Sequence, residues 1–293
     1  MKGVKQMEYL LKLKINLILK FLVIAVLIGG CATVHKPLDP ALTNQTYNMN
    51  VITMIPKGEI SIYLWKTNPG GLMGGLLWMA VDAVRDSRAQ KRIVPLLEAT
   101  ANVDFRAQYW NELEKPLAGS PWLKIKHLDK RTVAYTKEEA DELKPPLLIL
   151  KTFYALSADS QILFVQTQAI LWLKDVKKSD YFAVFMYNSD KVGKNNEDDE
   201  KAIALWAANN AELYRKALAE GIEQNIYMLQ LDLLGNLSNP KAESDEKTRI
   251  HFYEPNIGGM LKVNGHILSR ANNRILMRIE SGNLVSVPSG FEK

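Results

Sequence analysis

Apolar residues after position 50 follow the short periods of strands and helices. Two long apolar runs, at 147–156 and 161–173, are separated by the polar turn 157–160, and a third run (YFAVFMY) spans 181–187. Apolar runs of this length, bounded by turn residues, are typical of buried strands. The short turns between them predict antiparallel pairing.

Helical spacing flanks these strands on both sides. One predicted helix begins after the capping residue Asp104 and repeats an apolar residue every four positions, at Phe105, Tyr109, Leu113 and Leu117. A second, from about residue 198 to residue 234, would extend about 55 Å at 1.5 Å per residue. That length predicts a bend, for which Gly221 is the candidate, and Gly235 is the expected stop.

The last fifty residues are rich in short strand patterns. Asn264-Gly265, a strong hairpin signal, lies between two of them. We predict an α+β fold with a mainly antiparallel sheet, several packed helices and a short β-rich C-terminal meander. The expected organisation is an α+β domain at 51–235 and a β-rich segment at 248–289, packed on or next to it.

The first thirty residues have a different pattern. Five lysines and one glutamate precede an unbroken apolar run at 21–28, and Gly29 and Gly30 follow. A basic start, a short apolar run and small residues are typical of an export signal. A run of this length is too short to span a bilayer, which takes about 20 apolar residues. We therefore predict a signal peptide at residues 1–30.

The residues around the only cysteine resemble the lipobox of bacterial lipoproteins. In Ile28-Gly29-Gly30-Cys31 an aliphatic residue precedes two small residues and the cysteine. The resemblance implies that the Cys31 sulfur receives a diacylglycerol, that signal peptidase II cuts between Gly30 and Cys31, and that the new amino group is acylated. A thiolate is a suitable nucleophile for this chemistry. The alternative is an ordinary signal anchor with an incidental cysteine.

The resemblance also implies a location. In the family's sorting rule an aspartate after the lipidated cysteine retains the protein in the inner membrane, and this chain has Ala32 there. We expect an anchor in the outer membrane with the protein facing the periplasm, and the inner membrane is the alternative. Several acyl chains give durable anchoring. The polar, turn-rich residues 31–50 predict a flexible tether.

Charge and cysteine content limit the classes of partner. The chain of 293 residues has a formal net charge of +5, and the predicted signal accounts for +4 of it. The remaining charge of about +1 argues against nucleic acid as a partner. Because Cys31 is the only cysteine, the folded part contains no disulfide and depends on its core.

A glycine-rich apolar stretch leads into the first predicted helix, which begins at about residue 72 and is kinked or ends before Pro95. Its glycines have small-xxx-small spacing, at Gly70, Gly71, Gly74 and Gly75. One interpretation is a glycine-rich turn entering a buried helix; the other is a close contact with a subunit or the membrane surface. Together with Asp82 and the following Ser-Arg-Ala at 87–89, the stretch resembles uncharacterised envelope lipoproteins. That resemblance implies no activity.

Known catalytic and ligand-binding motifs are absent from the sequence. It contains no nucleophile elbow, phosphate-binding loop, dinucleotide fingerprint or zinc-protease motif, and its four histidines never have metal-ligand spacing. We therefore predict no catalytic, cofactor-binding or metal-binding residue, and no cofactor beyond the covalent lipid on Cys31. The expected function is a non-enzymatic adaptor, assembly or structural factor that binds an envelope protein or a second copy of itself. The alternative is a periplasmic hydrolase whose site residues are scattered in sequence.

Overall fold

The computed structural model describes most of the chain beyond residue 34. The described ranges are 35–56, 58–63, 87–136, 139–140, 142–175, 178–194, 198–235 and 247–292. The signal peptide at 1–30, Cys31 and the glycine patch at 70–75 lie outside the described residues. The predictions that concern them therefore stay predictions.

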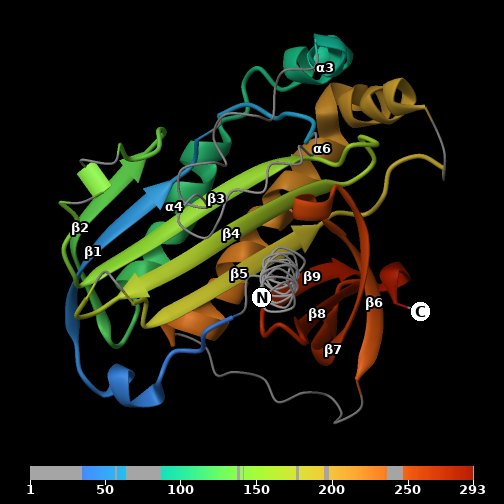
Figure 1. Cartoon of the computed structure of the whole chain (residues 1–293). Helices are drawn as coiled ribbons and strands as arrows, with labels where there is room; N and C mark the ends of the chain where they lie inside the picture. The colour runs from blue at the N-terminus through green and yellow to red at the C-terminus, as the bar shows by residue number, and fades with distance from the viewer. Residues whose placement is uncertain are drawn as a thin grey trace, which may run out of the picture. The chain divides into compact units, whose positions relative to one another are not determined.

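Within the described residues, nine strands form one continuous sheet in the order β2-β1-β3-β4-β5-β9-β8-β7-β6 (Figure 1). Their bounds are β1 (Tyr47–Met54), β2 (Leu123–Arg131), β3 (Leu147–Leu156), β4 (Leu163–Trp172), β5 (Tyr181–Asn188), β6 (Thr248–Glu254), β7 (Gly259–Ala271), β8 (Arg274–Ile279) and β9 (Leu284–Pro288). The C-terminal strands thus extend the main sheet through β9.

The sheet is mixed, and the predicted α+β class is confirmed. The β3-β4-β5 and β9-β8-β7-β6 blocks pair antiparallel, as the short turns predict. Three pairs, β1–β2, β1–β3 and β5–β9, are parallel. In each parallel pair a long connection separates the two strands in sequence, which allows the chain to cross over.

Two helices cover one face of the sheet (Figure 1). They are α4 (Phe105–Ala118) and α6 (Asp199–Leu229), and α3 (Ser87–Ala99) packs against α6. The four apolar residues predicted for the buried face of α4 are all buried, and the Asp104 side chain accepts a hydrogen bond from the Ala107 N–H, as expected of a cap. Apolar periodicity therefore predicted this helix and its orientation correctly.

The long helix α6 is interrupted, but not where the sequence suggested. Its backbone is left-handed at Asn209, Asn210 and Ala211, and helical again afterwards. The predicted bend near Gly221 is wrong. Gly221 is instead a point of close packing, because a Cβ there would lie 2.7 Å from Val165 Cγ2 and 2.9 Å from Tyr187 Cδ1. Asparagine tolerates the left-handed region better than most residues, which explains why the break occurs at the Asn pair.

The residues before β1 lie on the sheet. Lys36 forms an antiparallel bridge with Phe182 of β5, and a short 3₁₀ helix follows at Pro40–Asn44. Leu38 and Leu42 pack against the main core. The range 31–50, predicted as a tether, therefore includes docked residues from His35 onward. In the part of the chain that the structure describes, none of the helices is both long and apolar enough to span a bilayer.

Candidate functional site

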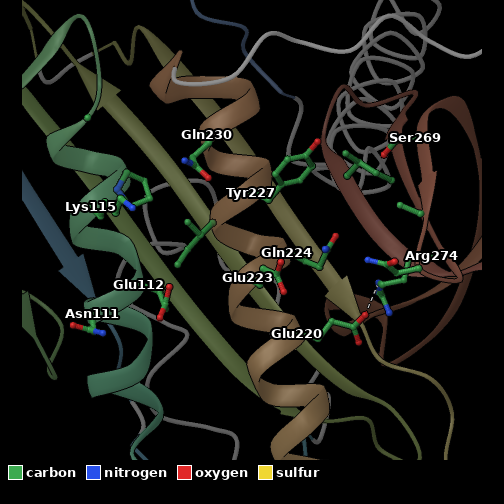
Figure 2. A pocket seen from close by; sticks show the side chains of 16 residues that line it. Asn111, Glu112, Lys115, Glu220, Glu223, Gln224, Tyr227, Gln230, Ser269 and Arg274 are labelled. Carbon is green, nitrogen blue, oxygen red and sulfur yellow. Dashed lines mark ion pairs between the residues drawn. The ribbon is translucent and has the colours of Figure 1, made fainter.

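A groove of about 920 Å³ lies between α4, α6 and the β7–β8 hairpin (Figure 2). Polar side chains from all three elements line it. Figure 2 shows Asn111, Glu112 and Lys115 on α4, and Ser269 and Arg274 on the hairpin side. The polar residues that α6 contributes are Glu220, Glu223, Gln224 and Tyr227, and Gln230 follows at the start of the next turn.

Helical periodicity aligns these side chains. Residues spaced three or four apart share one face of a helix, so the polar residues from 220 to 230 form a stripe beside the buried face of α6. The exposed α4 residues lie next to the face that packs on the sheet. The floor contains the buried Ile226 and Leu276. The groove is therefore polar on its walls and partly apolar on its floor.

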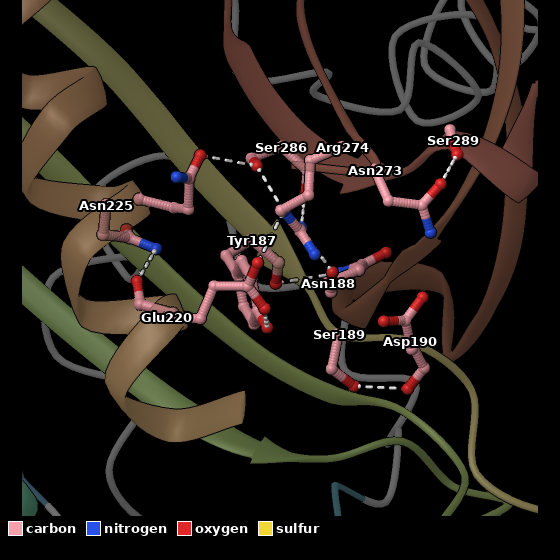
Figure 3. A network of polar contacts seen from close by, with 12 residues as sticks. Tyr187, Asn188, Ser189, Asp190, Glu220, Asn225, Asn273, Arg274, Ser286 and Ser289 are labelled. Carbon is pink, nitrogen blue, oxygen red and sulfur yellow. Dashed lines mark hydrogen bonds and ion pairs between the residues drawn. The ribbon is translucent and has the colours of Figure 1, made fainter. Parts of the chain in front are cut away.

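Arg274 is the best-fixed polar group of the groove, and its side chain is only 6% exposed. Its Nη2 donates to the Asn188 carbonyl (2.7 Å) and to the Ser286 carbonyl (2.9 Å), and its Nε donates to Ser286 Oγ (3.1 Å) (Figure 3). The guanidinium also lies over the Tyr187 ring, with Cζ 4.3 Å from the centroid. These contacts join β5, β8 and β9 at one point.

Glu220 faces this arginine from α6. The Tyr187 hydroxyl donates to Glu220 Oε2 (2.8 Å), and Arg274 Nε lies 3.5 Å from Glu220 Oε1. Burial, partly opposed by the charge of Arg274, raises the pKa of Tyr187, so this phenol stays a protonated donor. Ser286 Oγ donates to Gln224 Oε1 (2.9 Å), so this contact uses the amide oxygen of Gln224.

The arrangement is suited to binding a polar molecule. The charges of Arg274 and Glu220 compensate one another. The exposed Glu112, Glu223 and Lys115 together carry a net charge of −1. Carboxylates accept hydrogen bonds from hydroxyl, amide and ammonium groups, and side-chain amides can in addition donate to hydroxyl and carbonyl oxygens. Two glutamates on facing helices also have the residue types that general acid and base catalysis uses.

A second polar cluster joins the start of the described chain to the sheet. His35 Nε2 lies 3.0 Å from Asp232 Oδ2, which also accepts from the Tyr181 hydroxyl (2.6 Å). Arg278 Nη2 lies 2.7 Å from Asp232 Oδ1. Burial alone would raise the pKa of Asp232, but the hydrogen bond from His35, the charge of Arg278 and the hydrogen bond from Tyr181 lower it. Asp232 is therefore a buried carboxylate with three compensating partners.

The other histidines do not gather. In the sheet register His251 is opposite Lys262, and His266 is opposite Arg278. His127 is opposite Asn50 on the β2 edge. Across the described ranges, no group of three or more His, Cys, Asp or Glu side chains is placed to bind a metal ion.

Sequence reasoning nominated none of the groove residues. The predicted site residues Gly30, Cys31, Gly70, Gly71, Gly74 and Gly75 all lie outside the described residues. The helical spacing of the polar α6 residues can be recognised in the sequence. The residues of α4 and of the β7–β8 hairpin that complete the groove lie about a hundred positions earlier and about fifty positions later. No local motif links these three segments.

Comparison with known proteins assigns no function, so the proposed function is based on the sequence of residues 1–31 and on the groove. No protein-family model matches the chain, and a search of curated proteins finds no significant match.

Proposed function

We propose that the chain is a lipid-anchored envelope protein, fixed to the outer membrane through Cys31 and facing the periplasm, where it acts as a non-enzymatic adaptor or assembly factor. The order of basic residues, apolar run, two glycines and cysteine in residues 1–31 supports the anchor. The groove supports a binding role, because it offers a polar partner several hydrogen-bonding groups on a rigid frame.

The docked position of His35 supports the proposal. Cleavage between Gly30 and Cys31 would leave the whole described fold, which begins at His35, in the mature protein. A cut much further along would remove the partner of Asp232 and the bridge to β5. The proposed processing site and the folded domain are therefore compatible.

The anchor is tested by replacing the sulfur. Cys31→Ser removes the thioether donor, so incorporation of labelled palmitate and maturation to the processed mass should both be lost. Ala32→Ser, which leaves the four lipobox residues intact, is the control and should be labelled normally. Lipid labelling of Cys31→Ser would refute the anchor. If the family's sorting rule applies, Ala32→Asp should move the labelled protein to the inner membrane.

The binding role is tested in the groove. Glu112→Arg with Glu223→Arg reverses the exposed carboxylates on both walls and should abolish capture of the partner from solubilised envelopes. Glu142→Arg with Glu212→Arg makes the same charge change at exposed positions that do not line the groove. Equal capture by the two double variants would exclude the groove. Sedimentation of the purified protein decides whether the partner is a second copy.

A periplasmic hydrolase is the second candidate, and the facing glutamates of α4 and α6 favour it. If the groove is catalytic, Glu112→Gln or Glu223→Gln should abolish turnover of an envelope polymer while leaving the thermal melt unchanged. An adaptor predicts instead that the wild-type protein binds without releasing any product. Release of new polymer ends by the wild type alone would decide for the hydrolase.

A further inference from the structure

We infer that the end of the domain that holds His35 lies directly on the membrane surface, instead of being displayed above it on a tether. The inference rests on the proposed lipid anchor and adds an orientation to it. The surface concerned consists of His35, the described residues 174–175 and 178–180 of the β4–β5 connection, and the β8–β9 turn at 280–283.

The first support is how firmly His35 is held. Its backbone N–H donates to the Ser281 carbonyl (3.0 Å), and its ring packs edge-on against Tyr181 with centroids 5.9 Å apart. Its Nε2 contacts the carboxylate of Asp232, whose side chain is only 5% exposed. Three elements, β5, the β8–β9 turn and the π-helical turn Gln230–Leu234, therefore fix this residue.

The next residues extend the attachment. The Lys36 N–H donates to the Phe182 carbonyl (2.7 Å), and the Phe182 N–H donates back to the Lys36 carbonyl (3.1 Å). The Lys36 ammonium also donates to the Ser179 carbonyl. A segment with paired backbone bonds and a buried side-chain contact does not serve as a freely moving spacer.

The remaining connection to the lipid is short. Four residue steps separate Cys31 from His35, and a fully extended chain covers at most about 3.6 Å per step, or roughly 14 Å in all. A diacylglycerol on Cys31 has its glycerol among the headgroups, so the surface around His35 must lie within that reach of the bilayer. Lys174 and Lys178 are exposed on this surface and can contact anionic headgroups, beside the exposed Asp175 and Glu280, so the short reach and not net charge supports the orientation.

The start of the α6 segment that follows the left-handed break gives a reference position. Glu212 is exposed and lies twenty residues before Asp232, after the left-handed break. At 1.5 Å per residue this places it about 30 Å from the His35 cluster. If the His35 surface lies on the bilayer with α6 pointing away from it, probes at residues 178 and 212 should report very different depths.

Depth-dependent quenching tests the inference. Because Cys31 is the only cysteine and its sulfur would be consumed as a thioether, Lys178→Cys and Glu212→Cys each give a single reactive thiol. The lipidated full-length products, fluorescently labelled, are placed in vesicles of phosphatidylethanolamine and phosphatidylglycerol with nitroxide-labelled headgroups. We expect strong loss of fluorescence at 178 and background loss at 212.

Two further variants separate the possible failures. A Gly-Ser insertion of about 20 residues between Thr33 and Val34 adds a coil of roughly 25 Å and should abolish quenching at 178 while lipidation persists. Equal quenching at both positions, or quenching at 178 that the insertion leaves unchanged, would overturn the inference. If instead the protein takes up no lipid and stays off the vesicles, the proposed anchor itself fails.

Discussion

At the scale of single residues, two buried charges affect stability in opposite directions. Asp232 has three compensating partners and a lowered pKa. Lys151 is 3% exposed in β3, and burial lowers its pKa to about 8. A carboxylate held charged in the native state stabilises it above the unfolded pKa, whereas an ammonium forced into the interior destabilises it until it loses its proton.

Asp232 therefore makes the free energy of unfolding decrease at low pH. Because its native pKa lies below the unfolded value of about 3.9, its contribution is complete above that value and is lost as pH falls through the native pKa. Asp232→Asn should lower the free energy of unfolding by about 1–3 kcal/mol at pH 7, with a smaller difference at pH 3. Urea unfolding at both pH values measures this. The exposed Glu212→Gln serves as control, and an equal loss at the two pH values would contradict the assignment.

Lys151 should show the opposite dependence. Between pH 8 and 10.5 the unfolded chain retains a proton that the native state has released, so wild-type stability rises with pH. Lys151→Met should be more stable than wild type by on the order of 3 kcal/mol at pH 7, and the gain should shrink towards pH 10. Lys124→Met, on the exposed side of β2, should change little. A pH-independent gain would show that packing, and not charge, is responsible.

At the scale of elements, the sequence correctly predicted the features that depend on periodic spacing and on neighbouring residues. The buried face of α4, its cap and the β3–β4–β5 meander are encoded by neighbouring residues, and the structure has them. The parallel pairs could not be predicted, because nothing near β1 specifies that β2 and β3 flank it. The position of the α6 break was also predicted wrongly. Gly221 packs closely against the sheet and stays helical, whereas Asn209 and Asn210 adopt the left-handed conformation that asparagine tolerates.

The close approach of α6 to the sheet gives a direct test. Gly221→Ala would place a methyl group against Val165 and Tyr187, an overpacking that typically costs about 1–3 kcal/mol. Gly259→Ala, where a Cβ meets no atom within 4 Å, is the matched control and should be nearly neutral. Thermal melts of the two variants provide the comparison. Similar melting temperatures would mean that α6 can shift away from the sheet at little cost.

At the scale of the whole molecule, the groove and the N-terminal attachment both come from segments far apart in sequence. Arg274, Glu220 and Tyr187 meet only because β9 inserts next to β5. His35 meets Asp232 across almost two hundred positions. Periodicity predicts that each element exists and which face it buries, but not which elements become neighbours. For that reason the fold class was accessible from sequence and the candidate site was not.

Trimming the chain tests whether residues 35–46 belong to the fold. A protein beginning at residue 34 retains the contacts of His35, Leu38 and Leu42, and one beginning at residue 47 loses all of them. We expect the shorter protein to be less stable by roughly 2–4 kcal/mol, because Asp232 loses a partner and apolar surface is exposed. Urea unfolding of the two proteins measures this difference. Equal stability would restore the tether interpretation.

The junction between β5 and β9 has a mechanical consequence. Only three residue pairs, from Phe185–Leu284 to Tyr187–Ser286, join the two halves of the sheet there. Lys36 is bonded to β5 on one side of this junction, and His35 to the β8–β9 turn on the other. If a bound partner pulls against the proposed lipid anchor, the tension enters the fold through His35 and Lys36 and is divided between the two halves of the sheet. His35 precedes Lys36 along the chain from the anchor, so the contacts of His35 with Ser281 and Asp232 bear the load before the Lys36–Phe182 bridge and the three β5–β9 pairs do.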